Sequence, residues 1–238
     1  MYVVNDVSAA NGSSISEFSI GSTGALTAIG TVAAGNHAQS LTVDPLSRYV
    51  YATNQNDNTI SLYKINADGT LAANGTLAVP GNPPFTSQPR GITVDPTGRF
   101  VYVTERIQNR VHSYSINSDG TLTATGIATP SSGTMTHVAV DATGRWAYVP
   151  DLNSGIIHTF AVDQTTGVLT EGGSIGTAQG VRVGTEWIVS DPQGKWVYTG
   201  NGIDNSVSIF AINQSTGHLT LVATHAAGSN PQGLAVSR

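Results

Sequence analysis

The sequence predicts an all-β protein, a five-bladed β-propeller with four antiparallel strands per blade, and three periodic series of residues indicate it. Tyrosines recur in apolar segments at Tyr2, Tyr51, Tyr102, Tyr148 and Tyr198. A second aromatic series is Phe18, Tyr63, Tyr114, Phe160 and Phe210, and a glycine series is Gly24, Gly69, Gly120, Gly167 and Gly217. The three series keep one interval of roughly 48 residues, which is the mark of a repeat architecture.

Each repeat divides into four short strands, and the second repeat is representative. Residues 40–43, 49–53, 59–65 and 71–79 are rich in aromatic and β-branched residues or alternate with a period of two. Turn signals separate them, among them the Asp-Gly pair of residues 68–69. No segment has the 3.6-residue period of an amphipathic helix, so we expect essentially no helix.

The two ends of the chain are expected to complete one blade together. Residues 233–236 match the inner strand of the repeat, and residues 2–5 match the second strand. Pairing between them closes the ring and leaves no unpaired edge strand. Residues 1–238 would then be a single propeller domain. The open alternative is a fragment of a larger propeller that pairs with another copy.

Composition excludes several classes of partner. The net charge is −5 and no basic patch stands out, so we expect no nucleic-acid partner. No apolar run approaches the roughly 18–20 residues of a membrane span. The chain has no cysteine, which excludes disulfides and thiolate metal sites. The histidines lack metal-ligand spacing, and we expect neither a metal nor a cofactor.

Composition and the start of the chain bear on location and assembly. No signal peptide precedes the first predicted strand, because Met1 leads directly into it. The Ser, Thr, Asn and Gly content is common in exported bacterial proteins, which favours a secreted, periplasmic or cell-surface protein if a leader has been removed. We expect a monomer.

One polar position recurs three residues after each tyrosine of the first series. It is occupied by Asn5, Asn54, Glu105, Asp151 and Asn201. All five end the same strand of their repeat, so they should form a ring at one mouth of the central channel. Convergent oxygens suit a ligand or a hard cation. The alternative is that these side chains only cap the turns that follow.

Further candidates lie in the loops that enter the inner strands. Arg90 and Arg182 could hold a carboxylate or a phosphate, and Glu186 lies in the same long loop as Arg182. His37 and His137 precede inner strands and could move a proton, although a lone histidine there is more often a turn residue. The partner at this mouth is expected to be a small molecule, a glycan or a protein.

Three motifs resemble a known family. They are Val-Asp-Pro-Thr-Gly-Arg-Phe-Val-Tyr-Val-Thr at 94–104, Asn-Thr-Ile-Ser-Leu-Tyr at 58–63 and Asp-Gly-Thr-Leu at 68–71. They look like the repeat of lactonase-type propellers, the group of 6-phosphogluconolactonase and carboxymuconate-cyclising enzymes, and like the YVTN repeat of microbial surface proteins. The resemblance covers all five repeats. It implies a propeller that is typically seven-bladed and a lactone-opening or lactone-forming activity.

The family's functional positions are only partly matched. Arg90 matches an arginine of the family motif, while the following histidine position holds Gly91 and the glutamate position holds Arg106, with Glu105 on the asparagine position. The family's paired histidines fall on Thr134 and Thr136, and His137 is displaced by one.

Three functions stay open on this sequence. The mismatches and the reduced number of repeats favour a non-catalytic binding scaffold. The alternative is a lactone hydrolase or cyclase in which Arg90 binds the substrate's anionic group and Glu105 or His137 moves the proton. A third is an excised or engineered propeller with no native activity.

Overall fold

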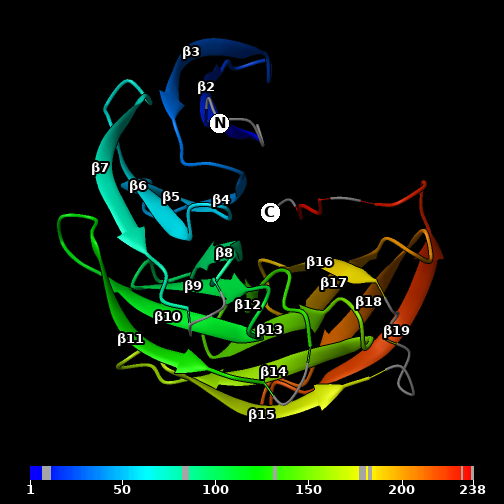
Figure 1. Ribbon diagram of the computed structural model, residues 1–238. Coiled ribbons are helices and arrows are strands. Elements are labelled where there is room, and N and C mark those ends of the chain that lie inside the picture. Colours follow the sequence, from blue (N-terminus) through cyan, green and yellow to red (C-terminus); the bar gives the residue numbers. More distant parts are fainter. Residues whose placement is uncertain are drawn as a thin grey trace.

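The computed structural model describes residues 1–6, 12–81, 86–130, 133–176, 181, 184–231 and 233–236. Within them the chain forms five antiparallel sheets and no helix (Figure 1). The first sheet has three strands, β1 (Tyr2–Asn5), β2 (Ser14–Ile20) and β3 (Leu26–Ala33). Among all the residues that the structure describes, no helix is long and apolar enough to cross a bilayer.

The other four sheets have four strands each, in chain order from the inner to the outer strand. The second comprises β4 (Ala38–Val43), β5 (Tyr49–Asn54), β6 (Thr59–Ile65) and β7 (Leu71–Ala78). The third comprises β8 (Pro89–Val94), β9 (Phe100–Glu105), β10 (Arg110–Ile116) and β11 (Leu122–Ala128). The fourth comprises β12 (Ala139–Val140), β13 (Trp146–Asp151), β14 (Ile156–Val162) and β15 (Leu169–Ile175). The fifth comprises β16 (Thr185–Ser190), β17 (Trp196–Asn201), β18 (Ser206–Ile212) and β19 (Leu219–Ala226).

The predicted all-β repeat is confirmed. The turn that follows each inner strand is built on an aspartate, as Asp95 illustrates. The Gly98 amide donates to the Asp95 carbonyl at 3.0 Å, and the Asp95 carboxylate accepts from the amides of Arg99 and Phe100, each at 2.7 Å. The sequence motif is therefore a turn that satisfies its own backbone donors.

Apolar packing joins each sheet to the next. Four buried clusters lie between successive pairs of sheets, and all have aromatic side chains at their centres. The rings of Tyr51, Tyr102 and Tyr148 have no exposed surface. Because every cluster is shared, no sheet has a core of its own, as expected of a repeat that buries its faces by stacking.

A specific contact repeats between sheets, and we call it the ring–turn lock. The ring of the aromatic residue that begins the second strand of one sheet lies against a glycine of the next sheet. This glycine is in the turn between the third and fourth strands of that sheet. A Cβ at Gly120, Gly167 or Gly217 would overlap the ring of Tyr49, Phe100 or Trp146, respectively. In two of the three contacts the tyrosine two positions further on donates its hydroxyl to the same turn, from Tyr51 to the Gly120 carbonyl (3.1 Å) and from Tyr148 to the Gly217 carbonyl (3.0 Å), whereas the buried Tyr102 hydroxyl has no partner among the described residues.

We expect Gly167→Ala to destabilise the protein more than Gly24→Ala. Both glycines have a left-handed φ, +72° and +82°, so both substitutions carry a backbone cost of about 1–2 kcal/mol. At Gly167 the new methyl group also displaces the Phe100 ring, whereas nothing lies within 4 Å of a Cβ at Gly24. Overpacking adds about 1–3 kcal/mol. Urea unfolding at low protein concentration measures the difference, and equal costs would show that the lock is not a tight contact.

The structure does not show the predicted closure of the ring. β1 pairs only with β2, and residues 233–236 form no strand. The sheets instead follow an open arc, with the first and fifth sheets at its two ends and the C-terminus between them (Figure 1). The repeat is local and could be seen in the sequence, whereas closure depends on the angle between sheets, which no motif encodes.

Candidate active site

The inner strands begin at one face of the arc, and bulges there redirect side chains. Pairing of β8 with β9 shifts register between Pro89 and Ile92, which puts Arg90 in the bulge, and pairing of β16 with β17 shifts around Glu186. Bulges are frequent beside active sites because they re-aim a side chain. Here they bring the Arg90 guanidinium and the Glu186 carboxylate into an ion pair across the arc, with 17% of each side chain exposed.

His137 lies beside this pair but is poorly placed to transfer protons. Its ring lies against Trp187 at an interplanar angle of 36° with 3.9 Å between the centroids, and both ring nitrogens are buried without a hydrogen-bond partner among the described residues. Burial, together with the charge of Arg90, lowers the pKa of His137 to about 3. A base this weak at neutral pH is far from the best match for proton transfer.

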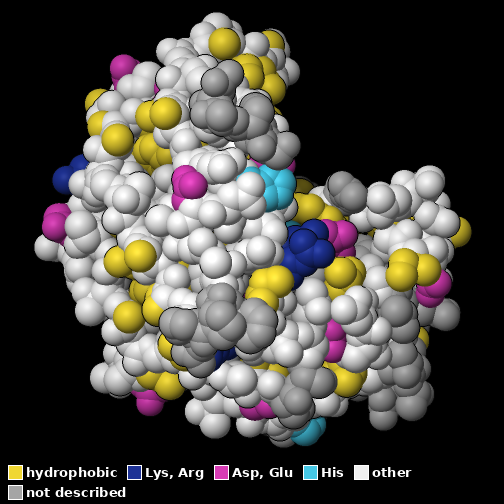
Figure 2. All heavy atoms as spheres, viewed as in Figure 1, with side chains coloured by type: hydrophobic (Ala, Val, Ile, Leu, Met, Phe, Trp, Pro, Cys, Tyr) yellow, Lys and Arg dark blue, Asp and Glu magenta, His cyan; other side chains and the backbone are white. Residues whose placement is uncertain are grey.

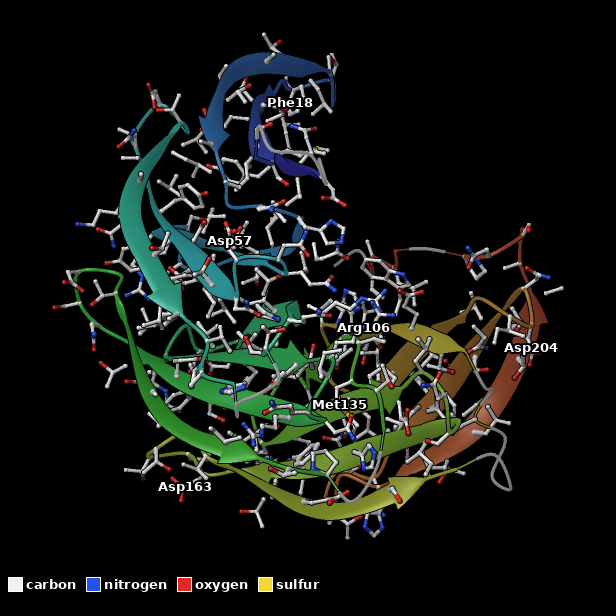
Figure 3. The ribbon with its side chains drawn as sticks, in the orientation of Figure 1. Phe18, Asp57, Arg106, Met135, Asp163 and Asp204 are labelled. Atoms are coloured by element: carbon white, nitrogen blue, oxygen red, sulfur yellow. The ribbon has the colours of Figure 1, made fainter. Side chains whose placement is uncertain are left out.

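Arg106 adds a second positive charge next to Arg90. Burial lowers the pKa of Arg90, and the nearby charge of Arg106 lowers it further. Arg106 lies at the inner edge of the arc (Figure 3) and lines a hollow of about 560 Å³ together with Gln88, Asn109 and Thr134. Within the described chain only Glu186 forms an ion pair with either arginine. Arg106 therefore has no ion-pair partner among the described residues.

A second histidine, His37, has the partner that His137 lacks. The Asp6 carboxylate lies 2.8 Å from His37 Nδ1, and 27% of the His37 side chain is exposed. A carboxylate on Nδ1 holds the proton there and leaves the lone pair on Nε2. The Gln39 amide, which occupies the bulge of β4, lies 3.0 Å from that Nε2. The φ of His37 is +57°, a strained value for a residue other than glycine.

Hydrogen bonds connect His37 to the arginines. The Gln55 amide donates to the His37 carbonyl at 2.9 Å, and the Gln55 side chain donates to that of Gln88 at 3.2 Å. The carbonyl of Gln88 accepts from the backbone of Arg106. Figure 2 shows basic, acidic and histidine side chains along the inner edge of the arc. Asp6, His37, Arg90, Arg106 and Glu186 therefore belong to one mouth.

The five recurring polar residues have partners within their own sheets. Asn54 donates to the hydroxyls of Thr59 and Ser61, both at 2.9 Å, and Asn201 donates in the same way to Ser206 and Ser208. Asn5 repeats this contact with Ser14 and Ser16. These amides pin the second strand to the third, which agrees with the structural alternative raised above.

The two acidic members of the five recurring polar residues, Glu105 and Asp151, also contact polar groups of the protein. Glu105 is fully buried with its Oε2 2.9 Å from His112 Nε2, so its carboxylate faces the interior of the third sheet. Asp151 accepts from the amides of Thr134 and Asn153 and from the Ser154 hydroxyl, and these hydrogen bonds lower its pKa although burial opposes them. Neither carboxylate joins Arg90.

Two remaining positions complete the comparison with the sequence. A side chain at Gly91 would meet the backbone of Thr136 and His137 at 2.6 Å, so packing against the fourth sheet excludes a histidine there. Arg182 lies outside the described residues. Among those described, no group of three or more His, Asp or Glu side chains could hold a metal ion.

Comparison with known proteins decides the family. The family model described as "Lactonase, 7-bladed beta-propeller" matches residues 1–238, the whole chain. The chain belongs to this lactonase family. A protein of Yersinia enterocolitica named 6-phosphogluconolactonase is 33% identical over 93 residues, which span 39% of this chain and 26% of that protein. The chain thus matches about a quarter of the length of this curated relative.

Solved structures show the same fold. A putative 6-phosphogluconolactonase from Bacteroides uniformis superposes with a TM-score of 0.85 at 22% identity, covering 99% of this chain and 71% of that one. The periplasmic gluconolactonase of Pseudomonas aeruginosa gives a TM-score of 0.79 at 19% identity, covering 97% and 68%. The resemblance stated from the repeat motifs is confirmed.

The preference for a non-catalytic scaffold is contradicted by these comparisons. The curated relatives and several of the structural neighbours carry the names of lactone-hydrolysing enzymes, which favours the hydrolase that was the alternative. The preference relied on missing motif residues.

Proposed function

We propose that the protein is a lactonase-type hydrolase that opens an anionic lactone, of which a phosphorylated sugar lactone is the best-fitting class. The observation that carries the proposal is that Arg90 and Arg106 lie near one another, since the Arg106 amide donates to the carbonyl of Gln88, and that of the two only Arg90 has an ion-pair partner among the described residues. Arginines bind phosphate and carboxylate groups through paired, charge-assisted hydrogen bonds. The names of the relatives agree with this substrate class.

The Asp6–His37 pair supplies the proton chemistry in this proposal. In the proposed reaction a water molecule displaces the Gln39 amide from His37 Nε2, Nε2 removes a proton from this water, and the resulting hydroxide attacks the lactone carbonyl carbon. The ring C–O bond then breaks, and the departing alkoxide takes the proton from His37, which restores the neutral imidazole. The product is the open-chain hydroxy acid. Asp6 orients the ring and stabilises the imidazolium that forms between the two transfers.

Acid release measured by pH-stat tests the function. We expect the wild-type protein to open 6-phosphogluconolactone faster than it opens spontaneously, and inorganic phosphate to inhibit competitively because it occupies the arginine pair. A rate equal to the uncatalysed rate, across phosphorylated, carboxylated and neutral lactones, would overturn the proposal.

A further inference from the structure

One irregularity of the sheets recurs where the inner strands begin. The residue before it pairs with the polar residue that ends the second strand, and these pairs are Ala38 with Asn54, Pro89 with Glu105, Met135 with Asp151 and Thr185 with Asn201. The residue after it has no partner in the ladder, and an unpaired residue of this kind re-aims its side chain. These residues occupy one position of the repeat, and we call them the bulge residues: Gln39, Arg90, Thr136 and Glu186.

Three of the four bulge residues are joined to one another. The Arg90 guanidinium pairs with the Glu186 carboxylate, and the Thr136 hydroxyl donates to the Glu186 carbonyl at 2.8 Å. The fourth, Gln39, lies on β4, which packs beside β8, since a backbone amide of β8 donates to a threonine hydroxyl of β4 at 3.3 Å. Gln39 and Arg90 thus hold equivalent positions on adjacent inner strands, and both lie at the mouth.

The Gln39 amide contacts the proposed proton-transfer pair. Its nitrogen lies 3.0 Å from His37 Nε2 and 3.4 Å from an Asp6 carboxylate oxygen, and among the described residues it has no acceptor outside this pair. The amide group carries two N–H donors and no charge. In the proposed reaction water takes the lone pair of Nε2, so the amide loses this acceptor as the reaction begins. A neutral donor is then free beside the attacking water.

We propose that the Gln39 amide donates a hydrogen bond to the lactone carbonyl oxygen, a role that rests on the proposed hydrolase function. As hydroxide adds to the carbonyl carbon, the C=O π electron pair moves onto the oxygen, which becomes an oxyanion. When the π bond forms again, the ring C–O bond breaks and the charge leaves this oxygen. A donor aimed at the oxyanion stabilises the transition state more than the substrate. A neutral donor suits this place, because a cation would oppose the positive charge that His37 acquires.

Two substitutions separate hydrogen bonding from shape. Gln39→Met keeps the length of the side chain and removes both N–H donors, so it should lower kcat by about 10²- to 10³-fold. Its KM for a phosphorylated lactone and its inhibition by inorganic phosphate should stay at the wild-type values, since both arginines still hold the anion. Gln39→Glu keeps the shape and puts a negative charge where the donor was, so its kcat should fall at least as far.

The pH profile of kcat distinguishes this role from one that only orients His37. Gln39 carries no titrating group and has left Nε2 in the reacting complex. Gln39→Met should therefore lower kcat by one factor at every pH and leave the midpoint of the profile in place. A side chain that only held the His37 ring would shift this midpoint on removal, because Nε2 would lose a donor in the reacting complex.

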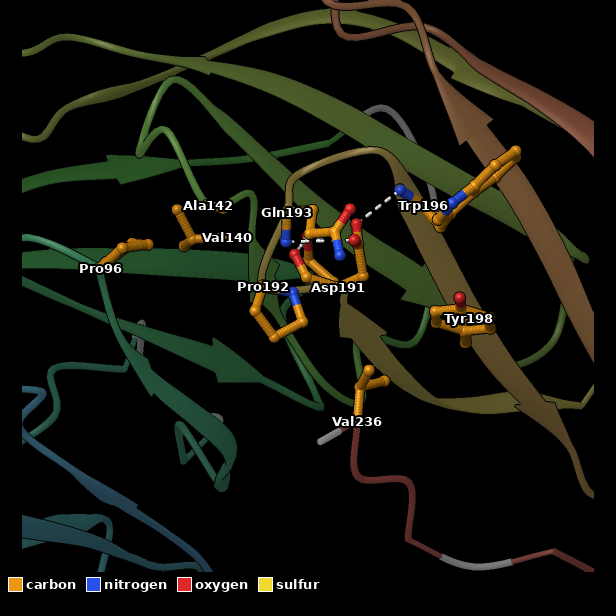
Figure 4. Close-up of a pocket in the computed structure, with 10 residues that line it drawn as sticks. Pro96, Val140, Ala142, Asp191, Pro192, Gln193, Trp196, Tyr198 and Val236 are labelled. Atoms are coloured by element: carbon orange, nitrogen blue, oxygen red, sulfur yellow. Dashed lines mark hydrogen bonds between the residues drawn. The ribbon is translucent and has the colours of Figure 1, made fainter. Parts of the chain in front are cut away.

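The matched control is Gln193→Met, the same change at an exposed glutamine in the turn that follows β16, at the other end of the inner strands (Figure 4). Its turnover should equal that of the wild type. Thermal unfolding checks that every variant is folded, and Gln39→Glu carries the test if Gln39→Met is not.

The outcomes separate this role from the hydrolase function itself. If the wild type is active and the Gln39 variants keep its kcat, lose only in KM, or shift the midpoint of the pH profile, the role of Gln39 is wrong while the hydrolase function stands. A wild type that opens no lactone overturns the hydrolase function, and the role of Gln39 with it.

Discussion

Replacing Arg90 with glutamine is expected to reduce kcat/KM for a phosphorylated lactone by roughly 30-fold to several thousand-fold. This range corresponds to about 2–5 kcal/mol, the free-energy cost of removing one partner of a buried, charged hydrogen bond. The loss has two physical causes. The anion loses its charged donor, and the half-buried Glu186 carboxylate, freed from its ion pair, repels the incoming phosphate. Steady-state rates on phosphorylated and neutral lactones measure the effect, which should fall mainly on the phosphorylated substrate.

The matched control is Glu186→Gln, which removes the compensating carboxylate and keeps the shape of the site. Because Arg90 is then released from its ion pair, the KM for a phosphorylated lactone should fall or stay constant. If Glu186→Gln instead abolishes turnover while Arg90→Gln is mild, the roles of the two residues are reversed. The anion site would then have to be placed elsewhere.

Replacing His37 with asparagine is expected to lower kcat by about 10²- to 10⁴-fold, the usual contribution of a positioned general base. Asp6→Asn should lower kcat similarly. Its amide would donate to His37 Nδ1, which moves the ring proton to Nε2 and removes the lone pair that takes the proton from water. Both effects should appear in kcat with little change in KM, since neither side chain binds the anion.

His137→Phe is the control for His37. It keeps a ring against Trp187 and removes two buried nitrogens that have no partner among the described residues. Turnover should stay near the wild-type value, because a buried histidine with a pKa of about 3 and no orienting carboxylate takes no part in the reaction. Loss of kcat in His137→Phe but not in His37→Asn would reverse this assignment.

The strands were predictable from sequence because their causes are local. Alternation in residues 59–65 and the turn glycines fix strand and hairpin without reference to the rest of the chain, and β6 has the predicted bounds. Residues 233–236 also read as an inner strand by composition, yet they form no strand and pair with no sheet in this structure. A strand at a sheet end depends on a partner, which the sequence of the strand does not specify.

The site was predictable only in part. Arg90, Glu186 and His137 were named from their loops, and the structure brings them together because their strands begin at one face. The Asp6–His37 pair was missed because the two residues come from different sheets, and only packing of the first sheet on the second joins them. Glu105 was predicted at the channel mouth, and its carboxylate contacts the buried His112, a contact between neighbouring strands that the strand-end position alone does not specify.

The measurement that tests the account most directly is the ratio of kcat/KM for a phosphorylated lactone to that for its neutral counterpart, in the wild type and in Arg90→Gln. Losing the buried charged partner costs about 2–5 kcal/mol, so the wild-type ratio should exceed about thirty and should fall toward one in the variant. A wild-type ratio near one, or a ratio that Arg90→Gln leaves unchanged, would contradict an anion site formed by Arg90 and Arg106.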